Sequence, residues 1–411
     1  MMKYGLKPYL KSLLSYTGPA LIVSMAYMDP GNYGTAIQAG ASTQYSLLWS
    51  VVLANMMAML MQYLSGKFGI AAGRSLPEQI RLSLRTKTRV VAFWLAAELA
   101  IAATDLAEYL GTVIALNILF GLSLLYASVL GALDVLLLLM LASKRFRTLE
   151  YFFMLAVSVI SIGFLYEIVV MRVDMVAVVK GFLSPSVNPG SMLLVVGIIG
   201  ATVMPHALFL HSDLAKNRLG GQSVEEKQSL RRLHLVENII ALSVAGLVNA
   251  AILITSAVSF YPQHSGVASV DEAYRIMEPL YGQMAATVFA VTLLFSGIAS
   301  STTGTVAGQA VMEGLLGISV NRNLRRFVTR VVNVVPTTAA ILIGLQPLQL
   351  LVYSQVVLSL MLPLPVIPLV IYTSRKNLMG NLVNRRITTM FSWMVASLII
   401  VFNTYLLISL V

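Results

Sequence analysis

The stretch AYMDPGNYGT, residues 26–35, places Asp29, Pro30, Gly31 and Asn32 side by side within a long apolar run. Proline removes a backbone N–H donor, and lipid offers no hydrogen-bond partner to the carbonyl groups that a broken helix leaves free. A carboxylate at bilayer depth is costly and marks a functional site by default. The stretch therefore predicts a membrane helix that is interrupted for a purpose.

The composition places this break in a membrane protein. The chain has 411 residues, of which 58% are hydrophobic and 11% charged, with a mean hydropathy of +0.83. A soluble domain carries about 25% charged residues, so this chain has too little polar surface to cover itself in water. Cysteine is absent, which excludes disulfides and thiolate chemistry. The net charge of +11 comes from short basic segments between apolar runs, so lipid and not nucleic acid is the expected partner.

Apolar runs of about 20 residues predict eleven membrane spans in a single integral domain covering residues 1–411. If the basic N-terminus is a retained first span that starts in the cytoplasm, all basic residues except Arg172, Lys180 and Arg275 fall in inside segments. We therefore expect a multi-pass plasma-membrane protein with its N-terminus inside and its C-terminus outside. The predicted spans are residues 15–40, 45–70, 89–115, 118–142, 149–171, 191–212, 233–256, 282–308, 326–345, 347–373 and 386–410.

A second interruption lies in GATVMPHALFLH, residues 200–211, at Met204-Pro205-His206. It comes five spans after the first, so the second half of the chain enters the membrane from the opposite side. Paired interruptions of this kind are typical of inverted-repeat transporters, in which the site lies where the breaks meet. The predicted repeats cover about 12–172 and 190–374, followed by an extra span at about 386–410. The alternative is that each proline only kinks a packed helix.

The side chains at the two breaks indicate a cation site. Asp29 and Asn32 offer oxygen ligands, and unwound backbone near Ala26 and Ala201 can offer carbonyls. Oxygens alone suit Mg²⁺, Ca²⁺ or Mn²⁺, whereas the thioether of Met204 favours softer ions such as Mn²⁺, Fe²⁺ or Cd²⁺. The alternative is that Met204 simply packs, as one of 21 methionines.

Acids and histidines elsewhere predict a route for protons. Glu98, Asp105 and Glu108 lie within roughly 80° of one another on one helix face. His206 and His211 follow Met204, and imidazoles with buried acids are common parts of proton relays. The alternative is a set of static salt bridges. Three further expectations concern packing and surface. Small residues of span 8 permit close helix contact: Ser296, Ser300, Gly304 and Gly308. His234 and Glu237 form a solvated polar edge at the start of span 7, and residues 270–282 form an amphipathic helix before span 8.

The motifs DPGNYGT (29–35), LAEYLGT (106–112) and ATVMPHALFLHS (201–212) resemble those of the Nramp divalent-metal transporters, and the resemblance covers nearly the whole chain. It implies a LeuT-type fold that imports Mn²⁺ or Fe²⁺ with protons. Leu364 departs from the family, which more often has an aromatic residue there. The resemblance implies a metal site formed by Asp29, Asn32, Met204, Gln355 and the carbonyls of Ala26 and Ala201. It implies proton transfer by Asp29, His206, Asp105 and Glu108, with arginines of span 9 as counter-charges, which we assign to Arg325 and Arg326. Arg330, one turn deeper, is an equally good partner on physical grounds.

We therefore expect an all-α polytopic membrane protein that works as a proton-coupled importer of Mn²⁺ or Fe²⁺ and as a monomer. The metal ion and protons are substrates, and no resident cofactor is expected. A Mg²⁺ transporter or a sodium-coupled amino-acid symporter of the same fold is the alternative; sulfur argues against the first and Asp29 against the second. A channel fits paired breaks less well. An enzyme is disfavoured because the sequence has no nucleophile–base pair or cofactor motif.

Overall fold

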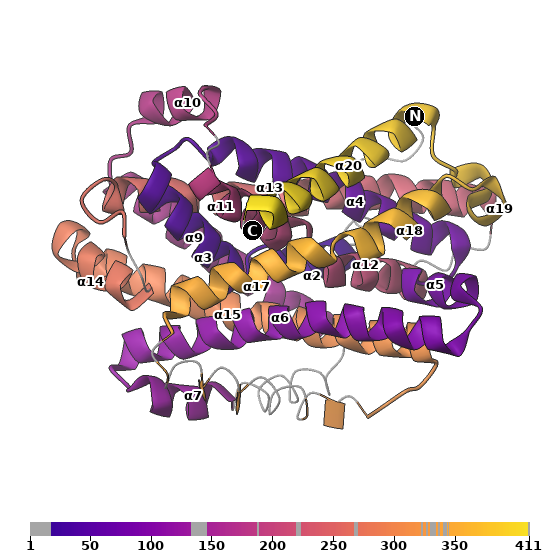
Figure 1. Ribbon diagram of the computed structural model, residues 1–411, viewed down its shortest axis with the longest axis horizontal. Coiled ribbons are helices and arrows are strands. Elements are labelled where there is room, and N and C mark those ends of the chain that lie inside the picture. The colour runs from indigo at the N-terminus through magenta and orange to yellow at the C-terminus, as the bar shows by residue number, and fades with distance from the viewer. Residues whose placement is uncertain are drawn as a thin grey trace.

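The computed structural model describes residues 18–132, 146–186, 189–218, 223–266, 270–321 and 345–409, with isolated residues between 324 and 343, and in these parts the secondary structure is helical (Figure 1). The helices are α2 Pro19–Ala26, α3 Pro30–Thr43, α4 Leu48–Ala72, α5 Leu76–Leu84, α6 Lys87–Phe120, α7 Leu124–Ala132, α9 Phe146–Val170, α10 Met175–Leu183, α11 Pro189–Val203, α12 Pro205–Arg218, α13 Val224–Phe260, α14 Val270–Tyr281, α15 Gln283–Leu316, α17 Pro347–Met361, α18 Pro363–Thr373, α19 Lys376–Met379, the short 3₁₀ helix η1 Gly380–Leu382 and α20 Arg386–Ser409.

The described residues contain 8 helical stretches that are long and apolar enough to cross a membrane. These correspond to eight of the predicted spans, and the predicted span 15–40 corresponds to the shorter helices α2 and α3. The all-α polytopic prediction is therefore confirmed. The structure describes the predicted span 118–142 as far as residue 132, where α7 ends, and most of the predicted span 326–345 lies outside the described residues.

Both predicted interruptions are present. α2 ends at Ala26 and α3 begins at Pro30, while α11 ends at Val203 and α12 begins at Pro205. Each second half starts with proline, which suits a first helical position because its missing N–H would have no partner there. Figure 1 shows the four half-helices in the middle of the molecule, where α3 packs on α13 and α11 packs on α17.

Span 10 is one continuous helical stretch, as predicted, with a local change of hydrogen bonding between α17 and α18. α17 ends at Met361 and α18 begins at Pro363, with Leu362 in helical conformation between them. The backbone N–H of Leu362 donates to Ser359 O over 3.1 Å, so the helix tightens at this point and then continues. Pro363 has no N–H to extend the α17 ladder, which accounts for the change.

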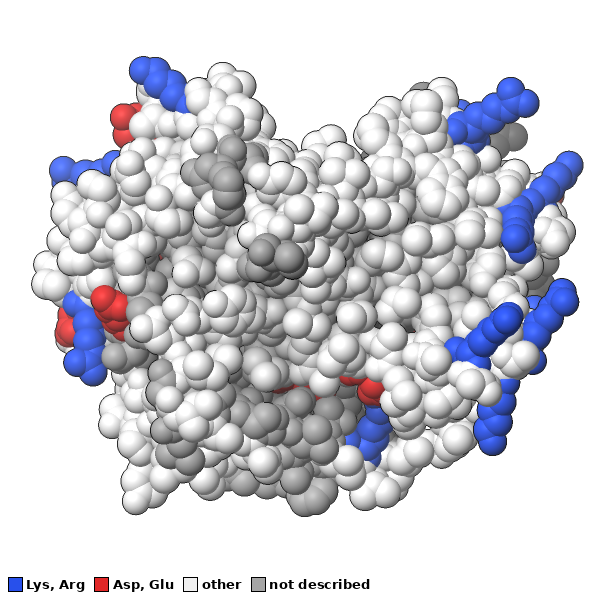
Figure 2. All heavy atoms as spheres, viewed as in Figure 1, with Lys and Arg blue, Asp and Glu red and all other residues white. Residues whose placement is uncertain are grey.

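Basic residues collect at the two ends of the long axis, with a largely uncharged band between them (Figure 2). α5 and α19 lie at one end and α10 and α14 at the other (Figure 1). Lys180 and Arg275, predicted to lie outside, belong to α10 and α14, whereas Arg81 and Lys376, predicted to lie inside, belong to α5 and α19. The arrangement agrees with the predicted division of charge, and which end faces the cytoplasm stays a prediction.

The small residues of span 8 pack as predicted. Gly304 of α15 faces α6 so closely that a Cβ there would lie 2.8 Å from Glu108 Oε2 and 3.1 Å from Asp105 Oδ1. Residues 270–281 form α14, as expected for the segment before this span. The α6–α15 contact therefore holds the acidic face of α6 in the interior of the protein.

Candidate metal site

Asp29 caps the second half of the first broken helix. Its Oδ1 accepts hydrogen bonds from the backbone N–H of Asn32 over 2.9 Å and from Asn32 Nδ2 over 2.7 Å. A carboxylate is well suited to this position because the first N–H groups of a helix have no internal partners and carry partial positive charge. The cap leaves the second oxygen unused: Oδ2 is buried and has no hydrogen-bond partner among the described residues.

Met204, at the second break, has an unusual backbone conformation. Its φ is 44°, in the left-handed region that residues with a side chain seldom adopt, and its side chain is fully buried. Such a conformation persists only where the surrounding structure fixes it, and it is found most often at functional sites. Three residues earlier, the carbonyl oxygen of Ala201 accepts a hydrogen bond from Asn32 Nδ2 over 2.9 Å. The two interruptions therefore meet.

Gln355 of α17 lies against the same break. A side chain at Gly31 would collide with the Gln355 amide and would come within 2.9 Å of Asp29 Oδ2. Only glycine allows this approach, so Gly31 provides the room that brings span 10 to the site. Gln355 Nε2 donates to Ser354 Oγ over 3.0 Å, and Oε1 is buried with no hydrogen-bond partner in the described part of the chain.

Ala26 is the last residue of α2, where backbone carbonyls lose their helical partners. All six predicted metal ligands are at most 3% exposed. The described residues contain no group of three or more His, Cys, Asp or Glu side chains placed to hold a metal. The site therefore offers one carboxylate, two amides, backbone carbonyls and one thioether, a mixture of hard and soft donors that suits a divalent transition-metal ion.

Two further side chains bond to the backbone of the first break: Asn249, which the sequence did not single out, and Ser296, which it assigned to helix packing. Asn249 of α13 donates through Nδ2 to the carbonyl of Tyr27 over 2.9 Å and to Asn32 Oδ1 over 3.2 Å. Ser296 of α15 donates to the carbonyl of Met28 over 2.5 Å. Both carbonyls belong to the three residues between α2 and α3, so these bonds satisfy backbone that lipid cannot. The only sequence signal for Asn249 is an amide in an apolar span.

The predicted proton residues adjoin this site. His206 Nδ1 lies 3.1 Å from Thr104 Oγ1 on α6, and His206 Nε2 has no hydrogen-bond partner among the residues described. Asp105, next to Thr104, and Glu108, one turn along the helix, are buried on the face that Gly304 covers. The chain of polar groups runs from the second break onto α6, where the sequence placed the three acids.

Arg325 forms an ion pair with Glu98, the acid of α6 nearest the start of the helix. Arg325 Nη2 lies 2.8 Å from Glu98 Oε1, and Trp94 Nε1 donates to the same oxygen over 3.0 Å. A side chain at Gly308 of α15 would collide with this guanidinium group. Arg325 therefore reaches α6 through Glu98, and its role as a counter-charge to Asp105 and Glu108 stays a prediction. Arg326 and Arg330 lie outside the described residues.

The expectation of a solvated edge at the start of span 7 is wrong, because His234 and Glu237 are both buried. His234 packs edge-on against His211, with ring centroids 4.8 Å apart, and His211 Nδ1 lies 2.9 Å from Gln62 Oε1. Glu237 Oε1 accepts from the N–H groups of Gly18 over 2.6 Å and Ala20 over 3.1 Å. α2 and α4 cover this part of α13. The position of the two residues near the start of the predicted span does not reveal this cover.

Residues 20–409 match the sequence profile of the family described as natural resistance-associated macrophage protein-like, Nramp. The chain is 42% identical over 398 residues to the divalent metal cation transporter MntH of Deinococcus radiodurans, covering 97% of this chain and 90% of the relative. A crystal structure of the Eremococcus coleocola manganese transporter matches with a TM-score of 0.86 at 34% identity, over 99% of this chain and 88% of that one. MhsT in complex with L-phenylalanine matches with a TM-score of 0.61 at 13% identity, over 95% and 97% of the two chains, which shows a shared LeuT-type fold alone.

Proposed function

This chain belongs to the Nramp family, and on that premise we propose that it imports divalent transition-metal ions such as Mn²⁺ and Fe²⁺ together with protons, by alternating access. The family consists of membrane transporters, and this chain has the membrane-spanning helices that transport needs. The metal ion and the protons are substrates, and no resident cofactor or enzymatic activity is proposed.

One observation carries the proposal: Asp29 Oδ2 is buried without a hydrogen-bond partner in the described part of the chain, at the point where the two breaks meet. The breaks meet there through the hydrogen bond from Asn32 to the Ala201 carbonyl, three residues before Met204. A buried carboxylate oxygen without a donor needs a proton or a cation. We infer that the arriving ion exchanges hydration water for Asp29, Asn32, Met204, Gln355 and the carbonyls of Ala26 and Ala201. The printed names of the relatives, a divalent metal cation transporter and a manganese transporter, support this class of ion.

The two alternatives of the same fold fit the site less well. A Mg²⁺ carrier is expected to use hard oxygen ligands, and Met204 adds a soft thioether. An amino-acid symporter needs a free helix N-terminus for the substrate carboxylate. In this chain Asp29 Oδ1 already accepts from the Asn32 N–H at the start of α3, so a second carboxylate would meet negative charge there.

Proton coupling is proposed along α6. Binding of a divalent cation favours loss of any proton from Asp29, and His206, two residues after Met204, leads through Thr104 to Asp105. Along α6 the acids lie in the order Glu108, Asp105 and Glu98 toward the start of the helix, which is predicted to lie in the cytoplasm. The Arg325–Glu98 ion pair supports a role for the span 9 cation in balancing these acids. His211, next to His234, is proposed as a branch of this route.

The protein is proposed to work as a monomer in the plasma membrane, with its N-terminus in the cytoplasm and its C-terminus outside. The distribution of basic residues between the two ends of the molecule supports this orientation (Figure 2). Reconstitution with a single orientation, followed by protease access to each terminus, tests it.

Uptake into proteoliposomes tests the metal proposal. We expect Met204→Ala to weaken competition by Cd²⁺ about tenfold and to let Ca²⁺ or Mg²⁺ compete with Mn²⁺, because the soft ligand is lost. Met61→Ala on α4 is the matched control, since Met61 is equally buried outside the site. If Met204→Ala leaves the order of competing ions unchanged, the thioether is not a ligand.

A pH-sensitive dye in the same vesicles tests proton coupling. Mn²⁺ entry should acidify the lumen, and Asp29→Ala should abolish both signals. Asp105→Asn and Glu108→Gln should reduce acidification more than Mn²⁺ entry. Mn²⁺ uptake without any proton signal in the wild type would reduce the acids of α6 to structural groups.

A further inference from the structure

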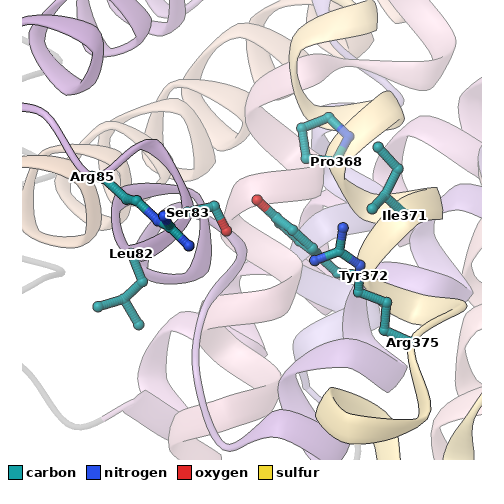
Figure 3. A pocket seen from close by; sticks show the side chains of 7 residues that line it. All are labelled: Leu82, Ser83, Arg85, Pro368, Ile371, Tyr372 and Arg375. Atoms are coloured by element: carbon teal, nitrogen blue, oxygen red, sulfur yellow. The ribbon is translucent and has the colours of Figure 1, made fainter.

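A pocket of about 410 Å³ lies between α5 and α18, and none of the proposed metal ligands lines it. Leu82, Ser83 and Arg85 line it from the α5 side, and Pro368, Ile371, Tyr372 and Arg375 line it from α18 and the residues that follow (Figure 3). Its volume is within the range of small-molecule binding sites. Its lining combines two guanidinium groups and two hydroxyl groups with three apolar side chains.

The charge in this pocket is unbalanced. No acidic residue lines it, and Arg85 and Arg375 form no ion pair with any residue that the structure describes. Both guanidinium groups are exposed to water, and an anion placed between them would be attracted by both. A phosphate is the anion that arginine binds best, because the planar guanidinium group donates two parallel hydrogen bonds to it.

Local structure holds both arginines at the pocket. Arg375 stacks on the ring of Tyr372, with its guanidinium carbon 6.0 Å from the ring centroid. Arg85 ends α5 with a φ of 60°, a left-handed conformation that usually belongs to glycine at this position. In Figure 3 the Arg85 guanidinium and the Tyr372 hydroxyl point toward each other across the gap. A residue with a side chain is strained in this conformation, and such residues are found most often at functional sites.

The position of the pocket identifies the source of the phosphate. The stretch that contains α18 and is apolar enough to span a membrane ends at Thr373, between Tyr372 and Arg375. The end of a span is expected at the level of the lipid headgroups, and the pocket lies there. Most basic residues are predicted on this side, where anionic lipids attract them. Leu82 is more than half exposed and, with Ile371, offers apolar surface beside the two cations.

We propose that this pocket binds the phosphate of an anionic phospholipid headgroup, with Arg85 and Arg375 on the phosphate, Ser83 and Tyr372 donating hydroxyl hydrogen bonds, and the start of an acyl chain against Leu82 and Ile371. The lipid bridges α5, between the second and third spans, and α18, the end of the tenth. It is a site separate from the proposed metal path, and it does not depend on which ion is carried.

Lipid binding to the full-length protein in neutral detergent tests this proposal. Native mass spectrometry should show phosphatidylglycerol binding at least about tenfold more tightly than phosphatidylcholine with the same acyl chains. Arg85→Gln and Arg375→Gln should each weaken phosphatidylglycerol binding about tenfold, and the lysine variants at these positions less. Lys376→Gln is the matched control, because Lys376 follows Arg375 in sequence and does not line the pocket.

Thermal unfolding distinguishes the two sources of phosphate. Phosphatidylglycerol should raise the unfolding midpoint of the wild type and of Lys376→Gln, but not of Arg85→Gln. Inorganic phosphate at the same concentration should have no effect on any of them. Equal stabilisation by inorganic phosphate would overturn the lipid assignment, and equal binding of both lipids by wild type and Arg85→Gln would overturn the site. Without added lipid, an unfolding midpoint of Arg85→Gln like that of the wild type verifies that the variant is folded.

Discussion

The side-chain amide of Asn32 donates a 2.9 Å hydrogen bond to the carbonyl oxygen of Ala201, and this bond joins the two interrupted helices across 169 residues of sequence. The same amide also donates to Asp29 Oδ1 over 2.7 Å. Asn32 therefore links the only carboxylate of the proposed metal site to the carbonyl next to the second break. The positions of Asn32 and Ala201 therefore depend on a contact between the two halves of the chain.

Asn249 is expected to set the affinity for metal without binding it. Asn249→Ala removes the donor to the Tyr27 carbonyl and to Asn32 Oδ1, and a buried acceptor left without a partner costs about 1–3 kcal/mol. We expect Mn²⁺ affinity, measured by isothermal titration calorimetry, to fall about tenfold or more. Asn238→Ala is the control, because Asn238 lies on the same helix and donates to Met59 O, away from the site. An equal loss of affinity in both variants would contradict this role.

Asp29→Asn should separate the two tasks of Asp29. Asparagine caps a helix about as well as aspartate, so the start of α3 and the thermal stability of the protein should be kept. The proposed site loses its only anionic ligand, and we expect Mn²⁺ uptake and lumen acidification to fall at least about tenfold. Asp29→Ala loses the cap as well and should unfold at a lower temperature. Uptake by Asp29→Asn at the wild-type rate would show that its charge is not needed.

The breaks could be predicted from sequence because proline and glycine act through the backbone of their own helix, at Pro30 and Pro205. The contribution of Asn249 could not, because an amide in an apolar span does not tell which helix it faces. Glu237 was misjudged for a related reason: its exposure depends on α2, a partner more than 200 residues away. Proximity of this kind is a property of tertiary packing. The roles of the metal and proton residues stay predictions, as do the roles of Arg326 and Arg330.

Glu237 is expected to keep α2 closed against α13. Gly18 has no side chain to cap α2, and the Glu237 carboxylate accepts its N–H and those of Ala20 and Leu21 instead. Glu237→Gln keeps the shape but removes the charge that suits a helix N-terminus. Because the chain has no cysteine, a single Ala20→Cys reporter can be labelled cleanly. Its labelling rate should rise several-fold in Glu237→Gln.

Glu225→Gln is the control for this effect, since Glu225 is exposed near the start of the same helix. Labelling of Ala20→Cys should proceed at the same rate in Glu225→Gln as in the parent. If Glu237→Gln also leaves the labelling rate unchanged, its carboxylate does not hold α2 in place.

Glu78 should make the stability of the predicted cytoplasmic end depend on acid pH. Burial opposes its ionisation, but Lys216 Nζ at 2.9 Å and the backbone N–H of Ser75 at 2.7 Å outweigh that effect, so the pKa of Glu78 is lowered. A lowered pKa means that the unfolded chain binds the proton more readily. The stabilisation is therefore complete above the unfolded pKa of about 4.3 and is lost as pH falls through the lower folded pKa.

Unfolding midpoints of the wild type and Glu78→Gln, measured from pH 7 to pH 3, test this sign. The wild type should be more stable at neutral pH, by no more than about 1 kcal/mol because both partners are partly exposed, and the difference should vanish toward pH 3. Lys216→Gln should flatten the same part of the profile. Lys227→Gln should not, because Lys227 donates to the Ala71 carbonyl over 3.0 Å and its bond does not require an ionised acid. A wild-type advantage that grows as pH falls would mean that Lys216 does not stabilise the ionised form of Glu78.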